Sequence, residues 1–172
     1  MRKQSTIYLV LIMICGLMSS SVNAQKRFAK AKLGKICGNP QLKCRTGDMV
    51  FQDYEMAFEF PKGDMVIVDS EPFYAIILKT VKPNSEADCE KTISDNERLE
   101  IQKLFTENKV FALKCYEPGN IYYTNVANNV NFIAVYAGKT LIEANGFLKT
   151  VKATGNYKGA NIRKMQAGIN GT

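Results

Sequence analysis

Residue types that commonly perform catalysis are few in this chain of 172 residues, which has sixteen carboxylates but no histidine. The lack of histidine excludes Ser-His-Asp and Cys-His nucleophile systems and the usual catalytic zinc sites. No GxxxxGK[ST] loop is present to bind a phosphate. A glycosidase pair needs two carboxylates ~5–10 Å apart with separated pKa values. That arrangement depends on the fold, and the spacing of carboxylates along the chain does not reveal it. The sequence therefore predicts a protein that is not an enzyme and needs no cofactor.

Residues 1–24 have the organisation of a secretory signal peptide. Two basic residues, Arg2 and Lys3, precede an apolar run from Ile7 to Met18. A small-residue cleavage site, Val22-Asn23-Ala24, follows that run. An uncleaved anchor is the alternative, although the apolar run is shorter than the ~20 residues that span a bilayer. We expect an exported protein, periplasmic or secreted, that contacts the membrane only through this segment before cleavage.

Four cysteines remain after that cleavage, and in an oxidising compartment an even number indicates disulfides. They are Cys37, Cys44, Cys89 and Cys115. Three pairings are possible. We favour Cys37–Cys44, which closes a loop of turn-forming residues, and Cys89–Cys115, which ties the loop before a predicted helix to the end of the next strand. A site with four thiolate ligands for a metal is the alternative, but the irregular spacings and the missing CxxC pair favour no metal.

The charge of the exported chain is +5, because cleavage leaves 21 basic residues against 16 acidic ones. Many of the basic residues come early, at positions 26, 27, 30, 32, 35, 43 and 45. Such a basic segment is either a solvated tail or a contact for an anionic envelope polymer. No nucleic-acid partner is expected for an exported protein.

Residues 131–166 predict a strand, a helix and a second strand. Phe132–Tyr136 is rich in strand formers, and Thr140-Leu141-Ile142-Glu143 has the form of a helix capping box. The residues after it repeat at helical spacing on one apolar side: Ala144, Phe147, Leu148 and Val151. Ala160–Met165 then alternates as a strand does.

An earlier stretch repeats this order. Phe73–Leu78 is an apolar strand, Ser94-Asp95-Asn96-Glu97 is a second capping box, and Lys109–Lys114 is the next strand. The apolar side of its helix is expected to hold Leu99, Ile101, Leu104 and Phe105. Two such units side by side predict an α+β fold, the split βαβ arrangement, with a four-stranded antiparallel sheet and both helices on one face.

The chain is thus divided into a signal peptide (1–24), a basic N-terminal extension with additional short strands (25–72) and a domain (73–172). In the extension, residues 49–60 interleave acidic and aromatic side chains. This strip either binds a partner or packs on the main sheet. Residues 121–124 form a further short strand candidate, and the asparagines at 125–131 make a loop whose amides serve turns or bind sugars.

The second unit resembles the second half of a SPOR domain. The resemblance is carried by Ile133–Thr140, the Glu143-Ala144 pair and Leu148, with Tyr74–Leu78 similar to the first SPOR strand. It covers residues 73–166 in short, permissive motifs. SPOR domains are bacterial envelope modules that bind peptidoglycan glycan strands lacking stem peptides. The resemblance implies an envelope protein that binds this glycan on the open face of its sheet.

Alternation along the strands predicts which side chains occupy that face. The candidate ligand-binding residues are Phe73, Ile77, Lys79, Phe132, Tyr136 and Arg163. Their aromatic rings suit sugar stacking if the face is open. If the extension covers the face, the rings are core, and the protein is instead an interaction or structural component that contacts another envelope protein.

Overall fold

The structure of the chain is a computed structural model that describes residues 32–44, 51–60, 67–115, 121–127 and 129–170. Residues 31–172 belong to one compact unit. The signal peptide predicted at 1–24 and the basic residues at positions 26, 27, 30 and 45 lie outside the described residues. Among the described helices, none is long and apolar enough to cross a membrane.

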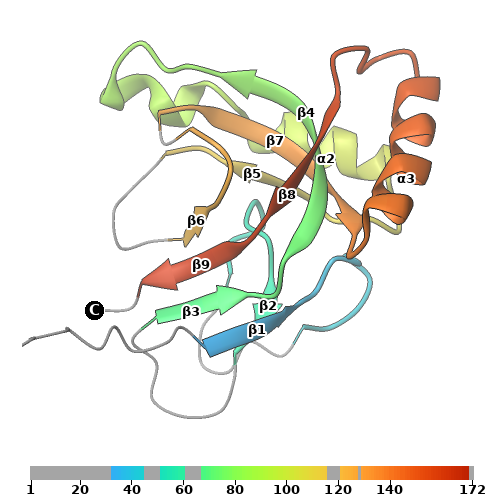
Figure 1. The fold of residues 1–172 in the computed structure, drawn as a ribbon. Coiled ribbons are helices and arrows are strands. Elements are labelled where there is room, and N and C mark those ends of the chain that lie inside the picture. The colour runs from blue at the N-terminus through green and yellow to red at the C-terminus, as the bar shows by residue number, and fades with distance from the viewer. Residues whose placement is uncertain (1–31, 45–50, 61–66, 116–120, 128, 171–172) are drawn as a thin grey trace, which may run out of the picture. The chain divides into compact units, whose positions relative to one another are not determined.

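The two predicted strand–helix–strand units form one antiparallel sheet with both helices on the same face (Figure 1). The first unit consists of β4 (Phe73–Val81), α2 (Asp95–Leu104) and β5 (Val110–Leu113), with a 3-10 helix, η1 (Glu86–Lys91), before α2. The second consists of β7 (Asn131–Gly138), α3 (Leu141–Ala153) and β8 (Asn161–Met165). The strand order β5-β7-β4-β8 is that of the split βαβ fold, so the predicted fold class is confirmed.

Both predicted capping residues begin their helices. The Thr140 hydroxyl accepts from the Glu143 amide, and the Glu143 carboxylate accepts from the Thr140 amide, which completes the capping box of α3. These bonds and those to Lys139 hold the pKa of Glu143 below its usual value. Ser94 caps α2 in the same way, but the Glu97 carboxylate pairs with Lys79 instead of closing a box.

The apolar side predicted for α2 is partly wrong. Ile101 and Phe105 are buried as expected, whereas Leu99 and Leu104 are about half exposed and Arg98 is buried in their place. Positions 98, 101 and 105 follow helical spacing, so the inward side of the helix is rotated from the predicted one. The buried Arg98 Nε has no hydrogen-bond partner among the described residues. Burial, and then the charge of Arg98, lower the pKa of Lys109 on the neighbouring strand end.

A second sheet covers the face of the first sheet opposite the helices. Its strand order is β2-β1-β3-β9-β6, drawn from β1 (Lys32–Ile36), β2 (Phe58–Glu59), β3 (Ile67–Ser70), β6 (Ile121–Tyr123) and β9 (Ala167–Asn170). Additional strands were predicted in the extension and near residue 121, but β9 was not predicted. The second sheet therefore combines the extension with two parts of the predicted domain.

Two strand pairs run from one sheet into the other. Chain continuity joins β3 to β4 and β8 to β9, and the pairs β3–β9 and β4–β8 are both antiparallel (Figure 1). Ser70 fixes the corner, because its hydroxyl accepts from the Ala167 amide and its carbonyl accepts from the Gln166 side chain. At the far end of the second sheet, Lys32 pairs with Val68 and Asn170 with Ile67. Both ends of the described unit thus lie beside the start of β3.

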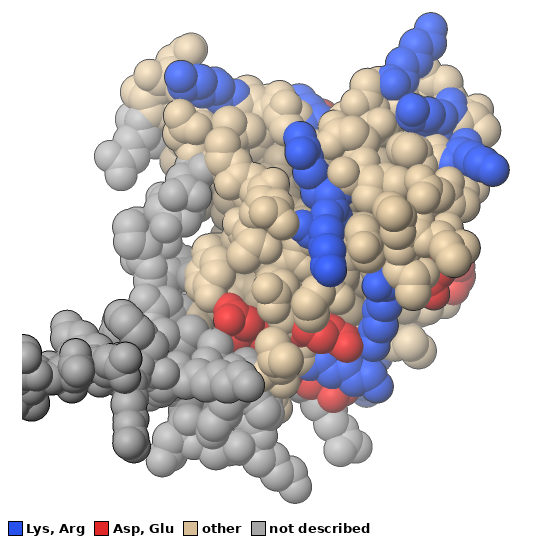
Figure 2. All heavy atoms as spheres, viewed as in Figure 1, with Lys and Arg blue, Asp and Glu red and all other residues tan. Residues whose placement is uncertain are grey.

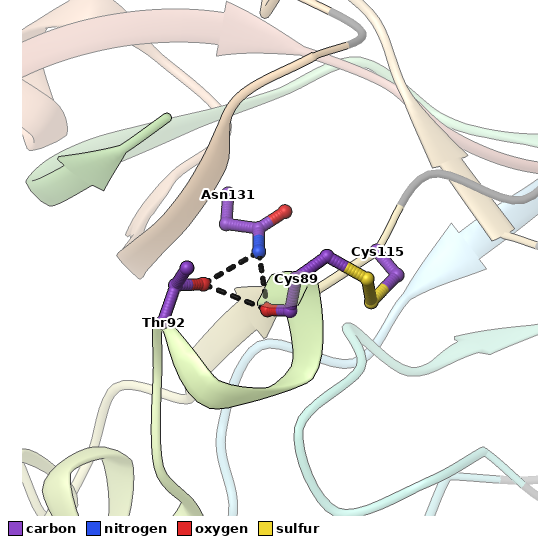
Figure 3. The surroundings of a disulfide bond; sticks show 4 residues. All are labelled: Cys89, Thr92, Cys115 and Asn131. Carbon is purple, nitrogen blue, oxygen red and sulfur yellow. Dashed lines mark hydrogen bonds between the residues drawn. A yellow bond between two sulfur atoms is a disulfide. The ribbon is translucent and has the colours of Figure 1, made fainter. Parts of the chain in front are cut away.

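The predicted disulfides are present, Cys37–Cys44 and Cys89–Cys115. The second ties η1 to the segment that follows β5 (Figure 3). The buried Asn131 side chain, at the start of β7, donates to the Cys89 carbonyl at 2.8 Å and to the Thr92 hydroxyl at 2.6 Å. The disulfide is therefore connected by hydrogen bonds to β7, one of the two interior strands of the sheet. Because all four thiols are used in these bonds, the thiolate metal site is excluded.

Candidate functional site

The sheet face predicted to bind a ligand is closed by the second sheet over most of its length. Phe73 and Phe132 are fully buried and Ile77 is only 5% exposed. They share a core cluster with Phe58 and Tyr123 from the covering layer. The expectation that these three residues are exposed on an open face is wrong, because the extension and β6 pack their own apolar side chains against them. The acidic and aromatic strip accordingly packs on the main sheet at Met56 and Phe58.

Tyr136, the residue predicted to stack on a sugar, is half-buried on the same face. Its ring lies 6.0 Å from that of Phe73, centroid to centroid. Gly38, in the loop closed by the Cys37–Cys44 disulfide, contacts the ring so closely that a Cβ at this position would overlap it. The disulfide loop therefore covers Tyr136, and a ligand cannot reach the covered side of the ring without moving that loop.

Lys79 lies on the helix side of the sheet, not on the predicted face. The register of β4 against β7 shifts between Ile77 and Lys79, which is a β-bulge or irregularity in the ladder. One extra residue reverses the alternation of side chains beyond it. The Lys79 ammonium consequently reaches the Glu97 carboxylate in the first turn of α2 at 2.8 Å. Lys79, which was predicted to bind a ligand, therefore forms a structural ion pair instead.

The remaining open part of the predicted face is a groove at the end of β4 and β8 away from the Ser70 corner. Its volume is about 340 Å³. Three predicted site residues line it, Ile77, Phe132 and Arg163. The other lining residues are Thr80, Asn125, Val126, Ala127, Val130 and Asn161. The groove thus combines an apolar base with hydroxyl, amide and guanidinium groups, the composition typical of a ligand site.

Hydrogen bonds to the backbone at the edge of the main sheet hold one wall of the groove. The Asn125 side-chain amide donates to the Lys164 carbonyl at 2.7 Å. The Thr124 amide donates to the Gln166 carbonyl, and the Gln166 amide donates back to the Thr124 hydroxyl. Asn125 has a φ of 60°, a left-handed conformation that asparagine tolerates better than most residues. These bonds position the Asn125 amide oxygen independently of any ligand.

Arg163 is the charged group of the groove. It is exposed on β8 opposite Ala75, so its side chain is on the sheet face that holds the core between the two sheets. Within the described ranges no carboxylate forms an ion pair with it. The guanidinium offers five donors in a fixed plane, which suit a carboxylate, a phosphate or a carbonyl oxygen. The groove can therefore bind a polar ligand that carries such a group.

Sequence reasoning placed Arg163 at this face but missed Thr80 and Asn161. The sequence does signal Asn125, because the amide-rich loop at 125–131 suits either turns or sugar binding. Alternation from Ile77 predicts that the Thr80 side chain lies on the helix side of the sheet. The bulge at Leu78 reverses this, so that the side chain lies on the groove side. Asn161 follows from the alternation of β8 once Arg163 is placed, because the two residues are two positions apart on one strand.

A second polar pair lies on the five-stranded sheet. The Tyr122 hydroxyl donates to the Asp69 carboxylate across β9, where Gly168 lies between them. A Cβ at Gly168 would overlap both side chains, so glycine is needed there. Burial, and then this bond to Asp69, raise the pKa of Tyr122 to about 12. Tyr122 is therefore neutral at neutral pH, and its bond to Asp69 is a cross-strand link.

No cluster of metal-binding side chains occurs in the ranges that the structure describes. In the comparisons with known proteins, no family model, curated protein or solved structure matches this chain. The resemblance to SPOR domains is therefore a prediction that rests on the quoted motifs.

Proposed function

We propose that this protein is an exported, non-catalytic binding module of the bacterial envelope that takes a glycan segment in the groove at Arg163. The observation that carries the proposal is the groove itself, which brings Arg163, Asn125, Asn161 and Thr80 around an apolar base. Sugars present both hydroxyl groups and apolar ring faces, and this lining matches both. The two disulfides fit an oxidising compartment, as expected for an exported protein.

The second sheet covers most of the face on which the sequence placed the glycan, but the groove at the end of that face stays open, and it is the place proposed for the glycan here. The sequence placed it along the whole sheet face, with Tyr136 stacked on a sugar ring. Since Tyr136 is covered by Gly38, the proposal now depends on Arg163 and the two asparagines. Arg163 would bind an acidic or acetylated substituent of the sugar, and the amides would bind its hydroxyl groups.

Retention on purified, amidase-treated peptidoglycan tests the proposal. Arg163→Ala and Asn161→Ala should each weaken retention about tenfold, as expected for one lost hydrogen bond to a charged or polar partner. Both residues are exposed, so their thermal melts should match the wild type. The matched controls, Lys103→Ala on α2 and Tyr136→Phe, should bind as the wild type does. No retention of the wild-type protein, or equal losses in the controls, would refute glycan binding in this groove.

A component of a protein assembly is the second candidate function. A groove of about 410 Å³ lies between α2 and the disulfide loop, where Leu99, Pro40 and Gln41 are among its lining residues. Leu42 and Leu104 nearby in sequence are more than half exposed. Exposed apolar side chains at a concave surface fit a protein partner. Loss of a co-purifying envelope protein on Leu99→Asp, with unchanged peptidoglycan retention, would favour this function.

A further inference from the structure

The outward side of α3 combines lysines with the most exposed large apolar side chain of the described residues. Ile142 is 85% exposed and Leu141 is 50% exposed, both in the first turn of the helix. At 100° per residue, Ile142, Gly146, Lys149 and Ala153 lie along one line of the helix surface. Leu141, Asn145 and Lys152 lie beside that line. We call these seven residues the α3 outer face.

The α3 outer face contains no carboxylate, and its surroundings are basic. From residue 139 to residue 170 the chain holds six cationic side chains and one acid, Glu143. That carboxylate is bound at the helix N-terminus by the Thr140 and Lys139 amides. Figure 2 shows Lys and Arg side chains over β8 and the upper end of α3, whereas the acidic side chains in this view lie mainly lower.

Most of these cations have no carboxylate partner within the described part of the chain. Lys139 pairs with Glu71 at 2.8 Å. Four other exposed lysines make no ion pair with a described residue: Lys149, Lys152, Lys158 and Lys164. Lys164 lies opposite Tyr74, on the helix side of the sheet, and so extends the basic surface from α3 to β8.

We propose that the α3 outer face docks on an anionic lipid bilayer, with Leu141 and Ile142 entering the headgroup region. A helix face that presents apolar side chains in its first turn and lysines two turns later, with no acid on that face, is suited to the membrane interface. The lysine stems can extend so that their ammonium groups reach the phosphates of the lipids. A soluble polyanion would use the lysines alone and leave Ile142 in water. A second copy of this chain would bring like charges together. This departs from the sequence-based expectation that only the signal peptide contacts the membrane.

Vesicle co-sedimentation tests the proposal, using protein that lacks residues 1–24 and retains the compact unit 31–172. Vesicles of phosphatidylcholine with phosphatidylglycerol should bind the protein, and vesicles of phosphatidylcholine alone should not. Each lysine near an anionic surface contributes about fivefold in affinity. Lys149→Glu with Lys152→Glu should therefore weaken binding by at least about twentyfold, and added salt should weaken the wild type. Ile142→Ser, which keeps the charge, should weaken binding several-fold.

Matched changes on α2 provide the control. Leu104→Ser and Lys103→Glu alter exposed positions on another helix, Leu104 being 52% exposed where Ile142 is 85% exposed, and should leave vesicle binding unchanged. Thermal melts of all variants should match the wild type, since every altered side chain is exposed. Equal binding to neutral vesicles would overturn the proposal. Unchanged vesicle binding of Ile142→Ser, together with equally tight binding of the wild type to soluble polyphosphate, would indicate a polyanion as the ligand and would also overturn the proposal. So would a wild-type dimer that Ile142→Ser dissociates, because the α3 outer face would then contact a second copy of the chain.

Discussion

Truncation of Phe132 tests whether the sheet face is covered. The ring is fully buried and packs edge-on against Phe111 at 6.0 Å and against Tyr123 at 5.4 Å, centroid to centroid. Phe132→Ala removes the buried ring and leaves a cavity between the two sheets, which should lower the free energy of unfolding by about 3–5 kcal/mol. Each lost aromatic pair accounts for about 0.5–1.5 kcal/mol of that loss beyond the buried area.

Urea unfolding with the disulfides intact measures this loss. In thermal melts, at about 2–4 °C per kcal/mol for a chain of this size, the melting temperature of Phe132→Ala should be about 6–20 °C below that of the wild type. Leu104→Ala, at a position 52% exposed, is the control and should lose less than about 0.5 kcal/mol. A loss below about 1 kcal/mol for Phe132→Ala would mean that the ring is not packed between two sheets. The sheet face would then be open to solvent, as the sequence-based sugar-binding prediction requires.

Two further predictions concern the disulfides and alkaline pH. Replacing Cys89 and Cys115 together by alanine should cost about 3.5 kcal/mol, against about 2.4 kcal/mol for the other disulfide, because loop-closure entropy grows with the separations of 26 and 7 residues. Equal losses in urea melts would contradict this account. The pKa of Tyr122 is raised to about 12 from an unfolded value near 10, so the folded state gains stability from the neutral phenol below pH ~10 and loses it as the pH approaches 12. Tyr122→Phe should flatten the fall in melting temperature over that range, and an unchanged slope would show that Tyr122 does not cause it.

Local signals predicted the parts of the fold that depend on neighbouring residues. Thr140 and Ser94 begin their helices because capping needs only the next three residues. The Cys37–Cys44 pairing follows from a short loop of turn formers, and Cys89–Cys115 follows from the order of the elements. The hydrophobic patterns of β4, β5, β7 and β8 gave the split βαβ arrangement.

The sequence left the covered face as one of two alternatives, because the choice depends on strand pairs that are distant in sequence. β9 pairs with β3 about 100 residues earlier, and nothing within residues 167–170 indicates that partner. The side of Lys79 depends on a bulge that alternation alone does not reveal. Arginine usually lies at the surface, so a prediction from hydrophobicity places Leu99 and Leu104 on the inward side of α2, where the structure instead buries Arg98.

The place where the two ends of the unit meet determines how it responds to tension. Lys32 at the start of β1 and Asn170 at the end of β9 both lie beside the first residues of β3. A force that separates these ends would pull across the strands and break the hydrogen bonds of β1 and β9 to β3 one after another. Strands loaded along their length instead share the force among many bonds at once. The fold is therefore expected to resist little tension between its ends, whereas the hydrogen bonds within each sheet would resist a shearing force along the strands much better.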